Sequence, residues 1–582
     1  MVIPNYIFET GLEEKDMLRS KAWMKTGRFA VAIVFIAGLE LVALNGVAQS
    51  SERGAQGSVS TRDARMDPDL MEISVPGLEK LYARHRYTVT EVTQWYLDRI
   101  ERYDGTYRAI LYLDKQEALR RAAEEDREPR NAKHGALWGV PIVIKANTSV
   151  HDWATSAGWT GFLKPGEELI APRDALVVQC LREAGAIFLG QTNMPDFAAS
   201  DTNISTAGGR TGDAYNVHYS PGGSSGGTAT AVAANFAVLG TGTDTANSIR
   251  QPSANNSLVG ILPTRGLTSI AGVEPLDWLR DNIGPLARDV RSAVIAFDVM
   301  QAEDSLDPRT LGSSEKAETG SYTRYLKKNA LRGIRFGVPW FILEGSPDIY
   351  GTGPHAPPNG GAVNPETRAA FMKAIEQLHA AGATVIIDKD ILPESFFADV
   401  RKVNPQPYRR EGLDRFLQEF GPPQYHSVAE FEAVTGNTFP PFLLGGARSG
   451  PVTPQRLIES DPQSEANFLG PQREALEEYE ATRKKWRLDG FVYPALQVPT
   501  YDETLPGASE EGPHSETAWV NRIGVPAVSV PGGFYSDGLP FGLEISGVRW
   551  KDGDLVGYAY AYEQATHNRH PPKLVEGPWK TE

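Results

Sequence analysis

The stretch from residue 220 to residue 250 constrains the fold more than any other part of the chain. It opens with the glycine–serine loop Gly222 to Gly227, which can adopt backbone conformations closed to other residues and lets a ligand approach the main chain. A Gly/Ser run of this kind is also typical of a flexible linker. The segment that follows, Ala229 to Leu239, is apolar and rich in alanine, as in a packed helix and strand. We therefore expect an ordered loop inside a folded domain.

A second stretch places a lysine where a buried strand ends. Residues 139–147 contain a continuous apolar run that leads directly to Lys145. Burial disfavours the ammonium form and lowers the pKa of a lysine from about 10.4, and a neutral lysine can act as a general base. The plain structural alternative is a lysine at the end of a strand whose charge reaches solvent.

Several short motifs accompany these two stretches and follow one another in a fixed order. They are Leu189-Gly-Gln-Thr-Asn-Met194, Gly222-Gly-Ser-Ser-Gly-Gly227, Gly242-Thr-Asp244, Ser248-Ile-Arg250, Gly284-Pro285, Gly524-Val-Pro-Ala-Val-Ser-Val-Pro531 and Asp537-Gly-Leu-Pro-Phe-Gly-Leu543. With the lysine strand, they resemble the amidase signature family, serine hydrolases that use a Ser-Ser-Lys triad without histidine. The resemblance covers residues 74–568 and is specific, because several motifs keep the order and spacing of the family.

The resemblance implies a role for three side chains. Ser248 would be the nucleophile, Ser224 the bridging serine and Lys145 the base, and the two serines are 24 residues apart, as in the family. Ser248 would attack an amide carbonyl carbon and form an acyl-enzyme that water hydrolyses. In the family the bridging serine follows a cis peptide bond, which here would join Gly223 to Ser224.

The resemblance also implies an oxyanion hole next to the nucleophile, made by the backbone N–H groups of Thr245, Ala246, Asn247 and Ser248. The pair Ala246-Asn247 stands where many members have Gly-Gly, and Ala146 stands where many have Asp. Because asparagine tolerates a left-handed backbone and alanine does not, we expect a narrower loop here. The supporting positions of the family are matched by Ser225, Thr243, Asp244 and Arg250.

Helices and short apolar strands alternate along the chain, which indicates an α/β protein. Thr88-Val-Thr-Glu91 is a capping box that opens one helix, and residues 174–183 and 186–189 predict a helix followed by a strand. The resemblance implies one large domain over residues 71–575, with a twisted mixed β-sheet covered by helices on both faces. Residues 51–70 are polar and are expected to be a linker.

The first 50 residues resemble a targeting segment. A basic stretch follows Met24, which would be a better translation start than Met1. The apolar run Phe29 to Leu39 is too short to span a bilayer. Gly46-Val-Ala48 fits the small-residue pattern of a cleavage site. Glu40 interrupts the apolar stretch, so an uncleaved anchor is the alternative. We expect export to the periplasm or the medium.

Composition limits the partners of the chain. A net charge of −15 makes nucleic acid and anionic membranes poor partners, and we expect no stable membrane span. Cys180 is the single cysteine and lies in an apolar helix pattern, so we expect a buried thiol and no intrachain disulfide. His151 and His218 belong to no cluster with metal-ligand spacing, so we expect neither a metal nor another cofactor. The oligomeric state is not predicted.

Two other motifs suggest different hydrolases. Gly223-Ser-Ser-Gly-Gly227 also fits the nucleophile elbow of an α/β-hydrolase esterase, with Ser225 as nucleophile and His567 or His570 as its base. That motif must follow a buried strand, and residues 216–221 make a poor one. Ser313-Ser-Glu-Lys316 fits Ser-x-x-Lys but lacks the partner motifs of a β-lactamase.

Three further alternatives concern function. A binding protein could keep the fold with the oxyanion hole closed by Ala246-Asn247. The amidase family also includes the amide-cleaving component of a tRNA-dependent amidotransferase, against which the export signal and the acidic surface argue. Within residues 300–480 the sequence assigns no role; segments 351–361 and 440–446 read as loops, and in the family this region contributes to the acyl pocket. We expect hydrolysis of a small-molecule amide. A peptide amide, a fatty amide, an aryl amide, an ester and a carbamate all remain open as substrates.

Overall fold

A computed structural model describes residues 63–128, 133–350, 358–447, 450–505 and 515–576. The chain separates into the units Met1–Gly57 and Ser58–Glu582, and the described residues all belong to the second. The predicted targeting segment and the first seven residues of the predicted loop 351–361 lie outside the described residues.

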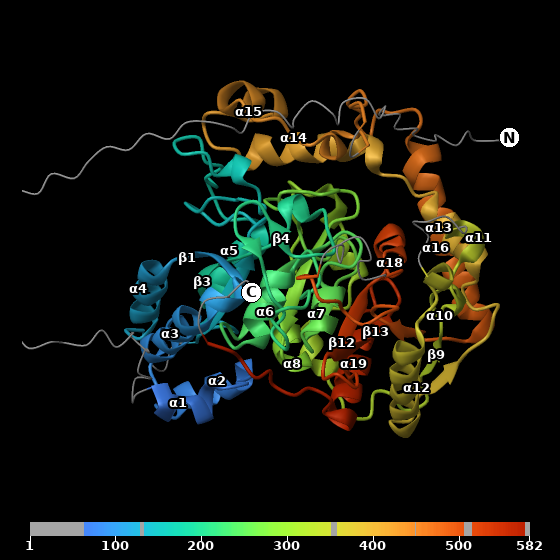
Figure 1. The fold of residues 1–582 in the computed structure, drawn as a ribbon, viewed down its shortest axis with the longest axis horizontal. Coiled ribbons are helices and arrows are strands. Elements are labelled where there is room, and N and C mark those ends of the chain that lie inside the picture. The colour runs from blue at the N-terminus through green and yellow to red at the C-terminus, as the bar shows by residue number, and fades with distance from the viewer. Residues whose placement is uncertain (1–62, 129–132, 351–357, 448–449, 506–514, 577–582) are drawn as a thin grey trace, which may run out of the picture. The chain divides into compact units, whose positions relative to one another are not determined.

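The centre of the second unit is a mixed sheet of 11 strands (Figure 1). Its order is β1-β3-β2-β6-β8-β7-β12-β13-β11-β9-β10, and β4 and β5 form a separate hairpin. The pairs β3–β2, β2–β6, β11–β9 and β9–β10 are parallel, and the other neighbours are antiparallel. The strands are β1 Ile110–Leu113, β2 Val140–Lys145, β3 Ala186–Thr192, β4 Ile204–Ser205, β5 Gly209–Arg210, β6 Leu239–Asp244, β7 Val259–Leu262, β8 Asn282–Ala287, β9 Arg335–Gly337, β10 Thr384–Ile386, β11 Gly490–Pro494, β12 Ala527–Phe534 and β13 Pro540–Ser546.

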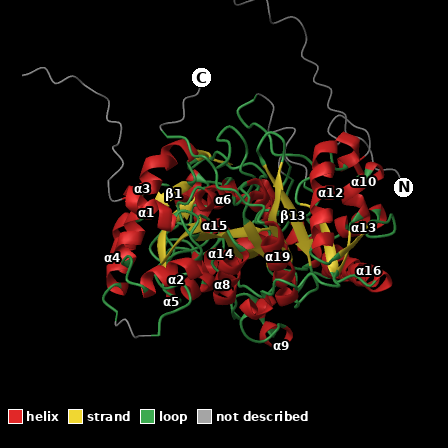
Figure 2. Ribbon diagram, turned by 90° about the horizontal axis from the view of Figure 1, so that it is seen from below, coloured by secondary structure: helices red, strands yellow, loops and turns green. Residues whose placement is uncertain are grey.

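Helices cover both faces of this sheet, and Figure 2 shows the central strands between α6 on one side and α8 on the other. The sheet and its helices form the α/β architecture that the sequence predicted. The helices are α1 Asp63–Leu70, α2 Val75–Ala83, α3 Val89–Tyr107, α4 Lys115–Glu125, α5 Leu176–Glu183, α6 Gly226–Ala233, α7 Arg250–Asn255, α8 Val290–Met300, α9 Ser313–Lys316, α10 Trp340–Glu344, α11 Pro347–Tyr350, α12 Pro365–Ala380, α13 Glu394–Arg401, α14 Arg409–Phe420, α15 Val428–Thr435, α16 Gly470–Trp486, α18 Trp519–Ile523 and α19 Asp552–Thr566.

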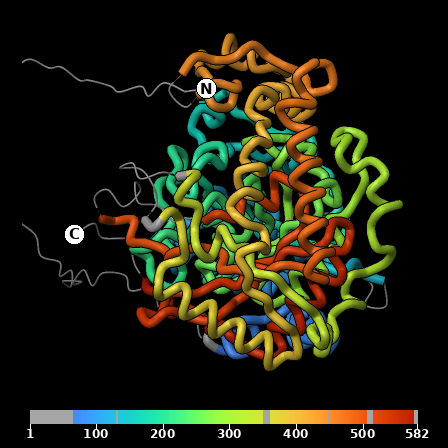
Figure 3. The backbone as a smooth tube through the Cα atoms, turned by 90° about the vertical axis from the view of Figure 1, so that its right-hand side faces the viewer, coloured from blue at the N-terminus to red at the C-terminus, as the bar shows by residue number. Residues whose placement is uncertain are grey.

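An aromatic cluster joins α14 and α15 to the loops that follow β2 and β3. Figures 1 and 3 show the backbone of these two helices at the same end of the molecule as those loops. Phe431 on α15 lies with its ring centroid 5.4 Å from that of Phe162 and 4.7 Å from that of Phe439. Phe197 contributes to the same buried cluster from the loop after β3. Part of the region between residues 300 and 480 therefore packs beside the ends of β2 and β3.

The capping box of α3 forms as its sequence predicts. Thr88 Oγ1 accepts the N–H of Glu91 at 3.0 Å, and the Glu91 carboxylate accepts the N–H of Thr88 at 3.0 Å. The apolar face behind this cap is buried, with Trp95 and Tyr96 both exposed by 1 % or less. This cap and this face explain why the helix begins where it does.

Several local predictions need correction. Residues 63–70 of the expected linker form α1, because Met66 and Leu70 lie one turn apart and both are buried. Cys180 is half-buried, since it lies at the edge of the buried face that Val177, Val178 and Leu181 form on α5. Among the described residues, no helix combines the length and the apolar character that a membrane crossing needs.

Candidate active site

The candidate site lies where two parallel neighbouring strands end. β2 ends at Lys145 and β6 ends at Asp244, and the two strands pair in register at Ile142 with Leu239 and at Val143 with Gly240. Because the carboxyl ends of parallel strands meet at one edge of a sheet, Lys145 lies beside the last residues of β6. The glycine–serine loop leads into α6 at the same edge, where Ser225 is the residue before the helix.

Lys145 is fully buried and contacts hydroxyl groups. Its Nζ lies 2.7 Å from Ser224 Oγ, 2.9 Å from Ser225 Oγ and 2.8 Å from Thr243 Oγ1. Burial lowers the pKa of Lys145 to about 7, against the opposing effect of the Asp244, Asp281 and Glu274 carboxyl groups. A neutral lysine amine keeps one lone pair, and this geometry lets it accept the proton of the Ser224 hydroxyl.

The glycine–serine loop approaches other backbone segments too closely for a side chain. A Cβ at Gly223 would lie 2.5 Å from Ser200 O, and a Cβ at Gly227 would lie 2.2 Å from Asn193 O. The peptide bond between Gly223 and Ser224 is cis. These glycines therefore allow the loop to pack closely enough for Ser224 and Ser225 to contact Lys145.

Ser248 lies next to this loop and is hydrogen-bonded to it through its main chain but not through its hydroxyl group. Its carbonyl oxygen accepts the N–H of Ser225 at 3.3 Å, and the residue is 5 % exposed. Among the described residues, the Ser248 hydroxyl makes no hydrogen bond. Of the two contacts that the predicted triad needs, the one between Lys145 and Ser224 is present and the one between Ser224 and Ser248 is not. Catalytic hydrogen bonds are often long before a substrate binds.

The loop before Ser248 presents free backbone donors. The N–H groups of Ala246, Asn247 and Ser248 donate no hydrogen bond to any described residue. Ala246 and Asn247 both keep negative φ, so the sequence Ala-Asn fits this loop without a left-handed backbone. The Thr245 side chain instead donates to Asp281 Oδ1 at 2.5 Å.

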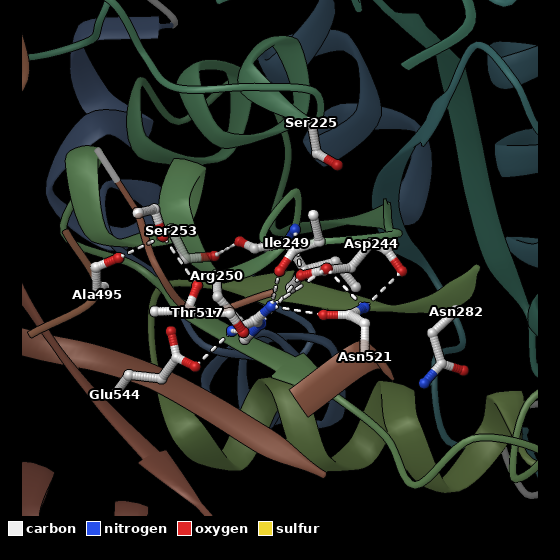
Figure 4. Close-up of polar contacts among 12 residues, drawn as sticks. Ser225, Asp244, Ile249, Arg250, Ser253, Asn282, Ala495, Thr517, Asn521 and Glu544 are labelled. Atoms are coloured by element: carbon white, nitrogen blue, oxygen red, sulfur yellow. Dashed lines mark hydrogen bonds and ion pairs between the residues drawn. The ribbon is translucent and has the colours of Figure 1, made fainter. Parts of the chain in front are cut away.

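Arg250 holds this loop against the body of the protein (Figure 4). Its guanidinium pairs with the carboxylates of Asp244 at 3.1 Å and Glu544 at 2.5 Å, and all three side chains are fully buried. The same guanidinium donates to Asn521 Oδ1 at 2.8 Å and to the carbonyl oxygen of Ala246. Asp244 also accepts the N–H of Ile249 at 2.9 Å, so both ends of the loop are fixed.

Sequence reasoning missed Glu544, Asn521 and Glu274 at this site. Glu544 lies on β13, and burial raises the pKa of its carboxyl to about 7 although Arg250 opposes that shift. An acidic residue inside an apolar strand is a signal that could have identified it. Glu274 is fully buried, and burial raises the pKa of its carboxyl well above the usual range.

The geometry of the site excludes the nucleophile elbow that the sequence suggested around Ser225. No strand precedes Ser225 in residues 216–221, where only Tyr219 forms an isolated bridge. Ser225 Oγ instead donates to Thr243 O at 3.2 Å and lies against Lys145. A nucleophile elbow needs a strand directly before its serine, so the Ser225 esterase interpretation is wrong on this geometry.

Several known proteins are similar to this chain in sequence and in fold. The peptide amidase from Stenotrophomonas maltophilia aligns with a TM-score of 0.70 and 30% identity, over 87% of this chain and 99% of that chain. An amidase family protein from Bacillus anthracis aligns with a TM-score of 0.68 and 26% identity, over 89% and 96%. The A subunit of glutamyl-tRNA(Gln) amidotransferase from Alkaliphilus metalliredigens is 30% identical over 511 residues, 85% of this chain and 96% of that protein.

The family model named Amidase matches residues 91–402, which include β2, the glycine–serine loop and Ser248. The same residues carry the strand-end lysine and the two serine loops described above. With the relatives and the shared fold, this match shows that the chain belongs to the amidase family, also called the amidase signature family, and is an amide-hydrolysing enzyme.

Proposed function

We propose that the enzyme hydrolyses a carboxylic amide through an acyl-enzyme on Ser248. The observation that carries this proposal is the buried Lys145, whose lowered pKa and 2.7 Å contact suit it to take a proton from Ser224. Ser224 in turn takes the proton of Ser248, whose oxygen bonds to the carbonyl carbon. The same relay returns a proton to the leaving amine, and water then releases the acid.

The free N–H groups of residues 246–248 support the role of an oxyanion hole. They lie directly before and at Ser248 and have no competing acceptor among the described residues. One such donor is worth about 3 to 4 kcal/mol to the transition state in comparable sites. Arg250 and Asp244 would hold these donors in place, because they fix both ends of the loop.

Labelling with a fluorophosphonate tests this assignment. We expect a single modified peptide that contains Ser248, and a labelling rate that falls about 10² to 10⁴-fold in Lys145→Met, because the base is lost. Lys115→Met is the matched control, since Lys115 is exposed and pairs only with Glu101. Modification of Ser225 would contradict the proposal, and no modification would favour a binding protein that keeps the fold.

The relatives that are named as amidotransferase subunits raise the alternative of a chain that works within a complex. The net charge of −15 disfavours a role at tRNA, so we propose that this chain acts on a small-molecule amide, with esters and carbamates open as substrates. Size-exclusion chromatography of the native protein from its own cells distinguishes the two. A complex with other proteins would contradict the proposal.

We also propose export, because the basic, apolar and small-residue order of the first 50 residues fits a targeting segment. Cell fractionation with N-terminal sequencing of the mature protein tests it. We expect the periplasm or the medium and a new N-terminus after Ala48; a cytosolic protein that starts at Met1 or Met24 would contradict export.

A further inference from the structure

Two side-chain amides beside Ser248 lack hydrogen-bond partners. Neither Oε1 nor Nε2 of Gln251 has a partner among the described residues, and the side chain is fully buried. Asn247 Oδ1 also lacks a partner there, and Asn247 is 2 % exposed. Leaving a buried polar group unpaired costs about 1 to 3 kcal/mol, so these atoms call for an explanation.

The backbone places these amides on the same side as the nucleophile. The N–H of Gln251 donates to Asn247 O at 2.8 Å, so a hydrogen-bonded turn leads into α7, which begins at Arg250. Positions three and four apart in such a turn lie on the same side of the backbone, which places Gln251 one turn after Asn247 and Ser248. Arg250 instead reaches Asp244 and Glu544 in the body of the protein.

The unpaired atoms define the chemistry of a ligand. Asn247 offers an acceptor, and Gln251 offers an acceptor and a donor, although the two side chains do not bond to each other. A second amide group has the matching N–H donor and carbonyl acceptor. An alkyl group would leave the buried amides unpaired, and a carboxylate would have no donor for the two acceptors.

We propose that Asn247 and Gln251 recognise an amide group in the acyl part of the substrate, one or two atoms from the scissile carbonyl. The substrate class is therefore a peptide or a diamide rather than a simple fatty or aryl amide. This inference rests on the proposed function, because it takes Ser248 as the reacting residue.

Protection of Ser248 from fluorophosphonate measures this preference without turnover. N-acetylglycinamide carries the second amide, and 4-methylpentanamide has the same shape with carbon in its place. We expect the first compound to give half-protection at a concentration about 10 to 100-fold lower, which corresponds to one or two hydrogen bonds. In Gln251→Leu this ratio falls to about one, because Leu offers neither donor nor acceptor.

Two further variants separate recognition from folding. Gln251→Met keeps the length of the side chain but has neither the donor nor the acceptor of the amide, so the ratio falls even if Gln251→Leu does not fold. Ser253→Ala is the matched control on the same helix, since Ser253 Oγ only donates to Ile249 O at 2.7 Å, and the ratio stays as in the unchanged protein. Unchanged folding is checked by thermal denaturation.

The outcomes distinguish the two proposals. Equal protection by both compounds, no protection by either, or an undiminished ratio in both Gln251 variants would overturn the amide-recognition inference while labelled Ser248 leaves the proposed function standing. Failure to label Ser248 at all would overturn the proposed function and this inference with it.

Discussion

Lys145 shows how one side chain can be prepared for base catalysis by its surroundings. Among the described residues its amine contacts three hydroxyl oxygens and the Thr243 carbonyl oxygen but no carboxylate, and burial outweighs the attraction of the nearby acidic groups. The last residue of a buried strand is a position where the backbone is rigid. A base that must stay neutral and in place is well served by such a site.

The lowered pKa of Lys145 predicts the pH dependence of the reaction. Since the pKa is about 7, the amine is neutral above pH 7 and charged below it, so kcat/KM rises through an apparent pKa near 7 and then levels. Unfolding restores a pKa near 10.5, so this group makes the free energy of unfolding rise with pH between about 7 and 10.5. A pH–rate profile checks the prediction; a rate that still climbs to pH 10 would contradict it.

At the scale of single elements, the glycines of α6 allow this helix to lie close to its neighbours, and they do not serve to make it flexible. All eight residues of this helix are buried, and it contacts β2, β6 and β8. Gly226 and Gly227 form its first turn, where a Cβ at Gly227 would meet the backbone of Asn193. The motif around Asn193 and the glycine–serine loop are thus packed directly against each other.

Gly227→Ala is therefore expected to destabilise the protein by about 1 to 3 kcal/mol, although alanine is usually the better helix former. Gly105→Ala in α3 is the control, since a Cβ there meets nothing within 4 Å, and it is expected to stabilise by about 0.5 to 1 kcal/mol. Thermal denaturation of the two variants gives the comparison. An equal rise in Tm for both would show that α6 can shift.

The sequence predicts those features whose interacting residues are close together in the chain, and it fails for those whose interacting residues are far apart. The capping box of α3 and the apolar run of β2 are local patterns, and both were predicted correctly. The distant partners of Arg250 could not be predicted, because Asn521 and Glu544 are 271 and 294 residues away and no local pattern links them. The helix α1 was missed because two buried side chains in a polar segment give too weak a periodicity.

Across the whole second unit, the C-terminal tail returns to the segment that precedes α2. Arg569 pairs with Glu72 at 2.7 Å and donates to Ser257 O at 2.7 Å, and Glu72 accepts from Asn235. The Arg569 side chain is 12% exposed and that of Glu72 28%. These contacts connect the beginning and the end of the described chain to the loops after α6 and α7.

Arg569→Met is expected to lower the stability of the protein by about 2 to 4 kcal/mol, because it removes the cation that pairs with Glu72 and the donor to the carbonyl oxygens of Asn256 and Ser257. Arg86→Met is the control, since that arginine is 60% exposed and an exposed ion pair such as the one with Asp69 adds little to stability. Denaturant unfolding of both variants tests the difference. Equal losses would mean that the tail contributes no more than a surface ion pair.

The anchoring of Arg250 also sets an order of events during synthesis. Glu544 leaves the ribosome 294 residues after Arg250, which takes about 15 to 60 s at common rates of translation. For most of that interval the nascent chain already contains Lys145, Ser224 and Ser248, while the Arg250 guanidinium still lacks Thr517, Asn521 and Glu544. The polypeptide therefore acquires a rigid nucleophile loop only once almost all of it has been made, and prematurely terminated chains are released without one.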